Sequence, residues 1–197
     1  MYKIIFLMLV TGMIGIARAE DIRLPEPNKT GKTTLMQALE DRHSDHAFSD
    51  QDLDDRTLGT ILWAAYGVNR DDGKRTIPTA MNQKDLDVYV FNRRGIWLYE
   101  ADNHVLKQIS DQNRLDLFQK QDYMAPVPVV LVYVGGSGDY APMHAGSAYQ
   151  NVGLFTAANN MASIVRGYFE RDKVAEVLNL KPDQRVIISQ AVGVQKN

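Results

Sequence analysis

The stretch VPVVLVYV, residues 127–134, decides the fold class. It is an unbroken apolar run rich in β-branched residues, which is typical of a central strand that is buried on both faces of a sheet. A Gly-rich segment, GGSGDYAP at 135–142, follows it and leads into a helix expected from about Met143 to Met161. A buried strand beside a long helix indicates a sheet that helices cover.

The rest of the chain supplies more strands and helices around this run. LDVYVFN at 86–92 and IWLYEA at 96–101 flank the turn RRG and predict a hairpin. The other expected elements are strands near 163–169 and 185–194, helices over 33–41, 50–67 and 172–180, and a short helix over 111–118. Asp50 is the expected cap of the helix over 50–67, and Asp111 is the expected cap of the short helix over 111–118. These elements predict one α+β domain, residues 20–197, with a mixed sheet flanked by helices.

GKTT at residues 31–34 looks like the end of a phosphate-binding P-loop, but the residues before it argue against one. A P-loop needs a glycine five positions before its Gly-Lys-Thr. That position is Glu26, whose carboxylate would repel a phosphate. We therefore expect Thr33 or Thr34 to cap a helix instead.

Residues 1–19, MYKIIFLMLVTGMIGIARA, predict export rather than a part of the fold. They combine a basic Lys3, an apolar run from Ile4 to Ala17 and a small-x-small sequence that ends at Ala19, which is typical of a secretory signal peptide. The run is short for a membrane span, and a membrane anchor is the alternative. We expect a periplasmic or secreted mature domain without a stable membrane anchor.

Composition excludes several classes of site. Hydrophobic residues make up 45% and charged residues 23% of the chain, as in ordinary globular proteins. A net charge of −2 gives no reason to expect a nucleic acid as partner. The chain has no cysteine, which excludes disulfides, thiolate chemistry and cysteine-based metal sites.

The segment DRHSDHAF, residues 41–48, is a candidate phosphate site. Arg42, His43, Ser44 and His46 place positive or potentially positive groups and a hydroxyl within five residues, and such donors suit a phosphate. A solvated polar turn is one alternative. A metal site is another, but two histidines without a third ligand make a poor one, so we predict no metal site.

Other segments are candidate sites only in combination. RTIPTAMNQ at 75–83 contains Pro78, which stiffens a turn, together with Thr79 and Asn82, which carry short polar side chains. The helix around Gln150 is rich in small residues, which would let a second helix or a flat ligand approach. Lys196 lies near the end of the chain. Taken singly, these features are explained by a loop, by helix packing and by a frayed tail.

In their order, these segments resemble the FMN-dependent nitroreductase family. The matching motifs are RHSDHAF at 42–48 for the family's Arg-Arg-Ser-x-Arg-x-Phe, PTAMN at 78–82 for Pro-Ser-Ala-x-Asn, Gln150-Asn151 for a Gln-Asn helix, and Val192, Gly193 and Lys196 for Val-Gly-x-x-Lys. The stretch 62–82 resembles the branch that includes azoline oxidases and small bacterial nitroreductase homologues. NMA at 160–162 stands where the family usually has Gly-Leu-Gly.

The resemblance implies FMN as the cofactor and an intertwined homodimer with shared sites. The resemblance implies that Arg42, Ser44 and Lys196 bind the phosphate and ribityl groups, with His43 and His46 nearby. It implies that Pro78, Thr79, Ala80 and Asn82 reach the flavin across the dimer interface. It also implies that Arg166 and Gly167 lie near the reactive edge of the ring. No catalytic side chain is required, because the flavin carries the redox chemistry.

The resemblance also implies an oxidoreductase that moves a hydride or electrons through the flavin N5. The second substrate is a small organic compound such as a nitroaromatic or a quinone. Nicotinamide cofactors are cytosolic, so an exported enzyme would need another electron donor or oxygen as the acceptor. The alternative is a non-catalytic flavin-binding or small-ligand-binding protein on the same fold.

Overall fold

The computed structural model describes residues 20–136, 138 and 140–196. The predicted signal peptide, residues 1–19, therefore lies outside the described residues. None of the helices in the described part combines the length and the apolar character that a bilayer crossing requires.

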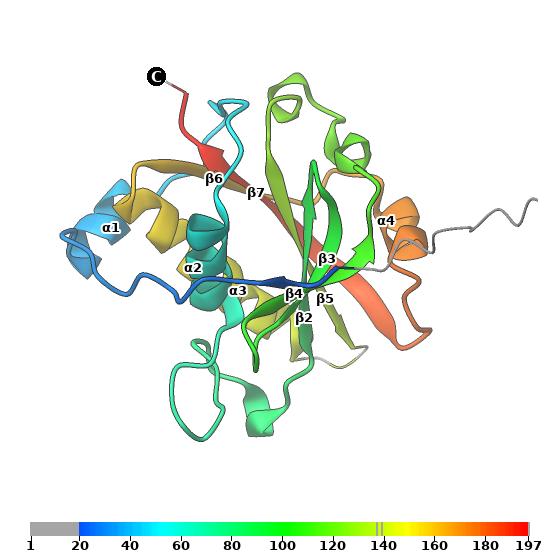
Figure 1. Cartoon of the computed structure of the whole chain (residues 1–197), viewed down its shortest axis with the longest axis horizontal. Helices are drawn as coiled ribbons and strands as arrows, with labels where there is room; N and C mark the ends of the chain where they lie inside the picture. Colours follow the sequence, from blue (N-terminus) through cyan, green and yellow to red (C-terminus); the bar gives the residue numbers. More distant parts are fainter. Residues whose placement is uncertain (1–19, 137, 139, 197) are drawn as a thin grey trace, which may run out of the picture.

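The described residues form one seven-stranded sheet (Figure 1) in the order β1-β4-β3-β2-β5-β7-β6. The strands are β1 (Ile22–Arg23), β2 (Leu86–Asn92), β3 (Gly95–Glu100), β4 (Val105–Ser110), β5 (Val129–Gly136), β6 (Met161–Arg166) and β7 (Gln184–Val194). All six pairings are antiparallel. The α+β class is confirmed, but the sheet is antiparallel rather than mixed, because β7 returns between β5 and β6 and runs opposite to both.

The apolar run that opened the sequence analysis forms the centre of this sheet. β5 pairs with β2 on one side and with β7 on the other, and its residues from Val129 to Gly135 are buried. Pro128, which has no N–H to donate, directly precedes the strand. The prediction of a strand buried on both faces is confirmed.

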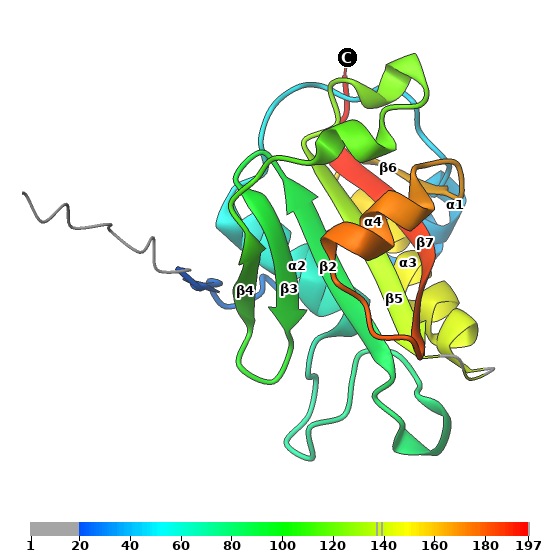
Figure 2. The same cartoon turned by 90° about the vertical axis from the view of Figure 1, so that its right-hand side faces the viewer.

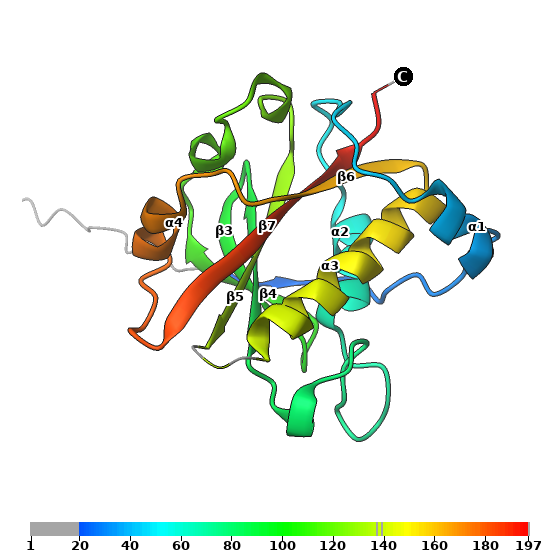
Figure 3. The same cartoon turned by 180° about the vertical axis from the view of Figure 1, so that it is seen from behind.

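Helices cover the two faces of the sheet. α2 (Asp55–Tyr66) and α3 (Ala141–Ala158) lie on one face, and α4 (Arg171–Val177) lies on the other (Figures 2 and 3). The short helices η2 (Leu115–Phe118) and η3 (Asp122–Met124) connect β4 to β5.

Residues of β5 alternate between two apolar cores. Leu131 and Tyr133 belong to the core under α2 and α3. Val130 and Val132 belong to the core that contains Phe118. This alternation is the period-2 geometry of a strand.

The predicted helix caps are correct at one helix and wrong at two. Thr34 caps α1 (Leu35–Asp41), since its side chain accepts from the Gln37 N–H. α2 starts at Asp55, and its cap is Asp54 rather than Asp50. The hydrogen bond from the Thr57 N–H at 2.7 Å lowers the pKa of the Asp54 carboxyl.

The predicted short helix over 111–118 is a 3-10 helix, η2, and Asp111 does not cap it. Asn113 accepts from the Leu115 N–H at 3.1 Å instead. The sequence analysis did not predict β4 or β1. The sequence of β4, VLKQIS, does not alternate between apolar and polar residues, and β1 has only two residues.

α3 ends in a way that bears on the sequence NMA at 160–162. Asn160 follows the helix with a φ of 52°, in the left-handed region that glycine usually occupies at helix ends. Asparagine tolerates this conformation better than other non-glycine residues. The chain therefore still turns at the end of α3 without the family's Gly-Leu-Gly. Met161 then begins β6.

Candidate functional site

The segment after α1 runs along the edge of the sheet beside β6. The Asp45 N–H donates to the Ser163 carbonyl at 3.0 Å, and Phe48, which is 2% exposed, forms an isolated bridge with Gln195. These contacts fix the segment at Asp45 and Phe48, and residues 42–44, which precede them, are exposed.

A cleft of about 190 Å³ lies between this segment, α3 and β6. Its lining consists mainly of polar residues together with a glycine and strand residues: Arg42, His43, Ser44, Tyr149, Gln150, Gly153, Ser163, Ile164, Val165 and Gln190. The structure therefore brings three of the four predicted phosphate-site residues together with the predicted Gln-Asn helix.

Arg42 reaches over α3 at a glycine. A Cβ on Gly153 would lie 3.5 Å from both Cγ and Cδ of Arg42, so the arginine stem rests on the helix backbone. In the described part of the chain, neither the Arg42 guanidinium nor the Ser44 hydroxyl takes part in a hydrogen bond with another residue. Both groups are exposed at the cleft and can receive a ligand.

His43 lies between a carbonyl and a carboxylate. Its Nδ1 is 2.7 Å from the Asp41 carbonyl oxygen, and its Nε2 is 3.6 Å from Oδ2 of Asp45. Asp45 is 8% exposed, and its Oδ1 accepts from the Ala47 N–H at 2.8 Å. The other carboxylate oxygen, Oδ2, faces the His43 ring but is buried without a hydrogen bond in the described part of the chain.

His46 does not line the cleft. Its ring packs edge-on against Tyr123 of η3, with 4.5 Å between the ring centroids. Lys196 lies close to this segment through its backbone, since its N–H donates to the Ala47 carbonyl at 2.9 Å, and its side chain is exposed. His46 thus lies within the phosphate-site segment and Lys196 lies beside it, and their contact with a cofactor stays a prediction.

Gln150 and Asn151 have different surroundings. Gln150 lines the cleft, whereas the Asn151 amide donates to the Ala64 carbonyl of α2 at 3.0 Å. Asn151 therefore joins two helices. Only the first residue of the pair is available to a ligand in the cleft.

A hydrogen-bonded chain that the sequence analysis missed forms the floor of the cleft. The Tyr133 hydroxyl donates to Oε1 of Gln190 at 2.7 Å, and the Gln190 amide donates to the Tyr149 carbonyl at 3.1 Å. Burial raises the pKa of Tyr133 far above its usual range, so its hydroxyl remains a donor and fixes the orientation of the Gln190 amide. The three residues are distant in sequence, and no local pattern marks them.

The predicted loop of Pro78, Thr79, Ala80 and Asn82 lies outside the cleft. It is attached near the start of α3, where the Ala80 N–H donates to Nε2 of His144 at 2.9 Å. His144 and Gln150 are six residues apart, which is roughly 9 Å along a helix. The loop and the cleft therefore lie at different levels of α3.

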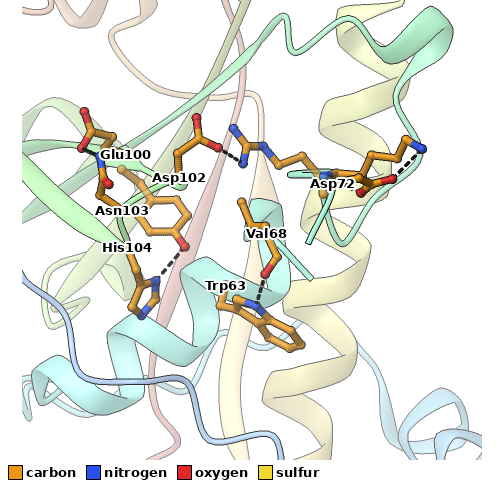
Figure 4. Close-up of polar contacts among 10 residues, drawn as sticks. Trp63, Val68, Asp72, Glu100, Asp102, Asn103 and His104 are labelled. Atoms are coloured by element: carbon orange, nitrogen blue, oxygen red, sulfur yellow. Dashed lines mark hydrogen bonds and ion pairs between the residues drawn. The ribbon is translucent and has the colours of Figure 1, made fainter. Parts of the chain in front are cut away.

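A polar cluster holds the segment that leads into this loop. Arg75, which is 6% exposed, donates to Asp102 at 2.7 Å and lies over the Tyr66 ring at 5.1 Å. The hydrogen bond from Arg75 lowers the pKa of the Asp102 carboxyl. Figure 4 shows Asp102, with Asn103 and His104 following it between β3 and β4.

Arg166 and Gly167 are placed away from the cleft. The Arg166 guanidinium is buried and donates to the carbonyls of Phe118 and Tyr168 and to Oε1 of Gln121, at 2.9, 3.1 and 2.6 Å. It therefore holds the η2–η3 segment on the opposite face of the sheet. Gly167 is exposed next to it, and a role for either residue at a flavin ring stays a prediction.

Gly193 matches the family motif for a packing reason. A Cβ at this position would lie 2.9 Å from Cδ of Pro128 and 3.2 Å from Cδ1 of Phe48. Glycine lets β7 pass both residues closely. Among the described residues, no group of three or more histidine, aspartate or glutamate side chains could hold a metal ion.

The sequence profile of the Nitroreductase family matches residues 39–194. The chain belongs to the nitroreductase family. A protein of Methanocaldococcus jannaschii that is described as a nitroreductase is 29% identical over 182 residues, which cover 82% of this chain and 90% of that protein. The match includes α2, α3 and most of the sheet of this nitroreductase-family chain.

Solved structures agree with this assignment. A crystal structure of a protein described as a nitroreductase from Ralstonia eutropha JMP134 superposes with a TM-score of 0.84 at 30% identity, and the match covers 100% of this chain and 99% of that one. A protein described as a nitroreductase from Desulfovibrio desulfuricans, solved in complex with FMN, has the same fold, with a TM-score of 0.60 at 18% identity over 84% of this chain and 88% of that one. Membership of this family indicates an oxidoreductase.

Proposed function

We propose that this protein is an exported FMN-dependent oxidoreductase that passes electrons to or from a small organic substrate such as a nitroaromatic or a quinone. The observation that carries the proposal is the pair of ligand-accessible donors at the cleft, the Arg42 guanidinium and the Ser44 hydroxyl. A guanidinium fork and a hydroxyl are the groups that bind a phosphate monoester.

The residues present fit the phosphate end of FMN. The arginine stem rests on α3 at Gly153, and Gln150 adds an amide that can donate or accept a hydrogen bond. The Asp45 carboxylate opposes an anion, but Asp45 is 8% exposed, and its Oδ1 already accepts from the Ala47 N–H. The donors at the cleft therefore remain directed to a ligand.

FMN, when bound, would supply hydride and electron transfer through its N5. The protein's own part is binding and orientation. Arg42 and Ser44 would hold the phosphate, and Gln150 would bind the chain between phosphate and ring. Gln190, fixed by Tyr133, would keep the floor of the cleft rigid.

The size of the cleft supports a shared site in a homodimer. About 190 Å³ is below the roughly 300–1,000 Å³ of most ligand sites, so this cleft holds only part of an FMN molecule. A second copy of the chain would enclose the rest and would contribute its Pro78–Asn82 loop. The apolar side chains that such a copy would cover are the exposed Leu35, Met36, Leu39, Met81 and Met143. Sedimentation of the holoprotein tests this, and a monomer with full flavin would contradict it.

Export is proposed from the sequence of residues 1–19 alone. The mature protein would begin at Glu20 and would act in the periplasm or outside the cell. N-terminal sequencing of protein recovered from the periplasmic fraction tests this. Recovery of an uncleaved chain in the cytoplasm would contradict it.

The deciding experiment is to purify residues 20–197, release any flavin by denaturation and identify it. The apoprotein is then titrated with FMN, and the reduced holoprotein is mixed with nitroaromatics, quinones, azolines or oxygen. FMN at one molecule per chain and reoxidation by one of these acceptors are expected. An apoprotein that takes up no FMN contradicts the proposal, and bound FMN that no acceptor reoxidises identifies a binding protein instead of an enzyme.

A further inference from the structure

One buried side chain contacts both the Pro78–Asn82 loop, at Ala80, and Asp85, which follows the loop. His144 on α3 is 3% exposed. Its Nε2 is 2.9 Å from the Ala80 backbone nitrogen, and its Nδ1 is 2.5 Å from Oδ1 of Asp85. The imidazole therefore joins Ala80 and Asp85 to the start of α3.

The hydrogen bonds fix the tautomer of this histidine. The Ala80 N–H can only donate, so Nε2 of His144 must accept and carries no proton. Nδ1 then carries the proton and donates it to the Asp85 carboxylate. A carboxylate that selects the tautomer of a histidine is a well-known arrangement, and here its effect is to present an acceptor to the loop.

The loop needs such an attachment because its own conformation is unfavourable. Met81 and Asn82 have φ values of 51° and 56°, and two successive non-glycine residues in the left-handed region are strained. The turn has local hydrogen bonds from Asn82 to Thr79 and from Gln83 to Ala80, at 3.1 and 2.9 Å. The bond from Ala80 to His144 ties this strained turn to the rigid helix.

We infer that Asp85 and His144 are positioning residues that hold the Pro78–Asn82 loop in its flavin-binding conformation. The inference rests on the proposed function, because the loop is the segment proposed to contact FMN. In this inference neither residue contacts the cofactor itself: Asp85 orients His144, and His144 holds the loop. Each acts through the backbone of Ala80, and a loop already held in its bound conformation binds more tightly because less ordering is needed on binding.

The test compares two variants of His144. His144→Gln places an amide oxygen near the position of Nε2 and keeps an acceptor for the Ala80 N–H. His144→Leu fills the space without an acceptor. FMN titration of the apoproteins should show about a tenfold weaker Kd for His144→Leu, the upper range for one neutral hydrogen bond, and a change of less than about threefold for His144→Gln.

Hydrogen exchange at the Ala80 amide in the apoproteins gives a readout without flavin. Protection should fall in His144→Leu and stay near the wild-type level in His144→Gln. A matched control is His104→Asn, which alters another histidine held by two hydrogen bonds, to the Tyr99 hydroxyl and the Pro25 carbonyl. This control should lower the melting temperature and leave both FMN affinity and Ala80 protection unchanged.

The outcomes separate this inference from the proposed function. Wild-type affinity in His144→Leu overturns the inference and leaves the proposed function intact. A His144→Gln protein that binds as weakly as His144→Leu also overturns it, because the loss is then not due to the acceptor. A wild type that takes up no FMN overturns both. Should His144→Leu fail to fold, Asp85→Ala against Asp85→Asn repeats the comparison, and equal FMN affinity in the two overturns the inference.

Discussion

Replacing Arg42 with alanine should weaken FMN binding about tenfold. A hydrogen bond to a charged group contributes about 1.5–3 kcal/mol, and the lower end applies because Arg42 is exposed and solvent screens its charge. About 1.4 kcal/mol corresponds to a factor of ten in Kd. Lys196 is exposed near the chain end, and ordering its long side chain offsets part of its attraction for phosphate, so Lys196→Ala should change Kd less than about threefold.

The assay is titration of apoprotein with FMN and, separately, with riboflavin, which lacks the phosphate. Arg42→Ala should weaken FMN binding and leave riboflavin binding unchanged. Arg185→Ala is the control for net charge, since Arg185 is exposed at the start of β7 and does not line the cleft. The reasoning is refuted if Arg42→Ala binds FMN as tightly as the wild type, or if riboflavin binding falls equally.

Three further predictions concern the loop, a histidine and two glycines. Asn82→Gly, which keeps the positive φ of 56°, should lower FMN affinity up to about tenfold with little change in the unfolding temperature of the apoprotein; a large drop in that temperature would assign Asn82 to the fold. Burial lowers the pKa of His104, so the unfolded chain binds a proton at this residue more readily than the folded chain does. The free energy of unfolding should therefore fall as pH decreases below about 6.5. Urea unfolding from pH 8 to 5 measures this dependence, and His104→Asn should flatten it. Gly193→Ala should destabilise the apoprotein by about 1–3 kcal/mol, because its Cβ would overlap Pro128, whereas Gly153→Ala, whose Cβ meets only ordinary contacts, should melt no lower than the wild type.

Local sequence patterns predicted most elements of the fold. The run at 127–134 is apolar throughout, and the structure places it at the centre of the sheet. The start of α2 was placed wrongly because Asp50 and Asp54 are equally good caps by residue type, and only the hydrogen bond to Thr57 distinguishes them. The antiparallel course of the sheet was not predictable, because it depends on β7 entering between β5 and β6, and no local pattern encodes that position.

The candidate site was predictable only where its residues are neighbours in sequence. Arg42, His43 and Ser44 form one cluster in the chain and one wall of the cleft. By contrast, Asp85 and His144 are 59 residues apart. A lone buried histidine in a helix has no sequence pattern that would reveal its partner, so its link to the loop needed the structure.

A match to a family motif identifies the fold more securely than it identifies cofactor contacts. Gly193 fits the motif because Pro128 leaves no room for a side chain, and Asn151 fits it because α3 must be joined to α2. Packing explains both residues whether or not a flavin binds. Arg42 and Ser44 have no comparable partner in the described part of the chain, and packing does not explain them. For this reason the proposed function depends on these two residues. Titration of Arg42→Ala with FMN and with riboflavin therefore tests it more directly than a substitution at Gly193 or Asn151.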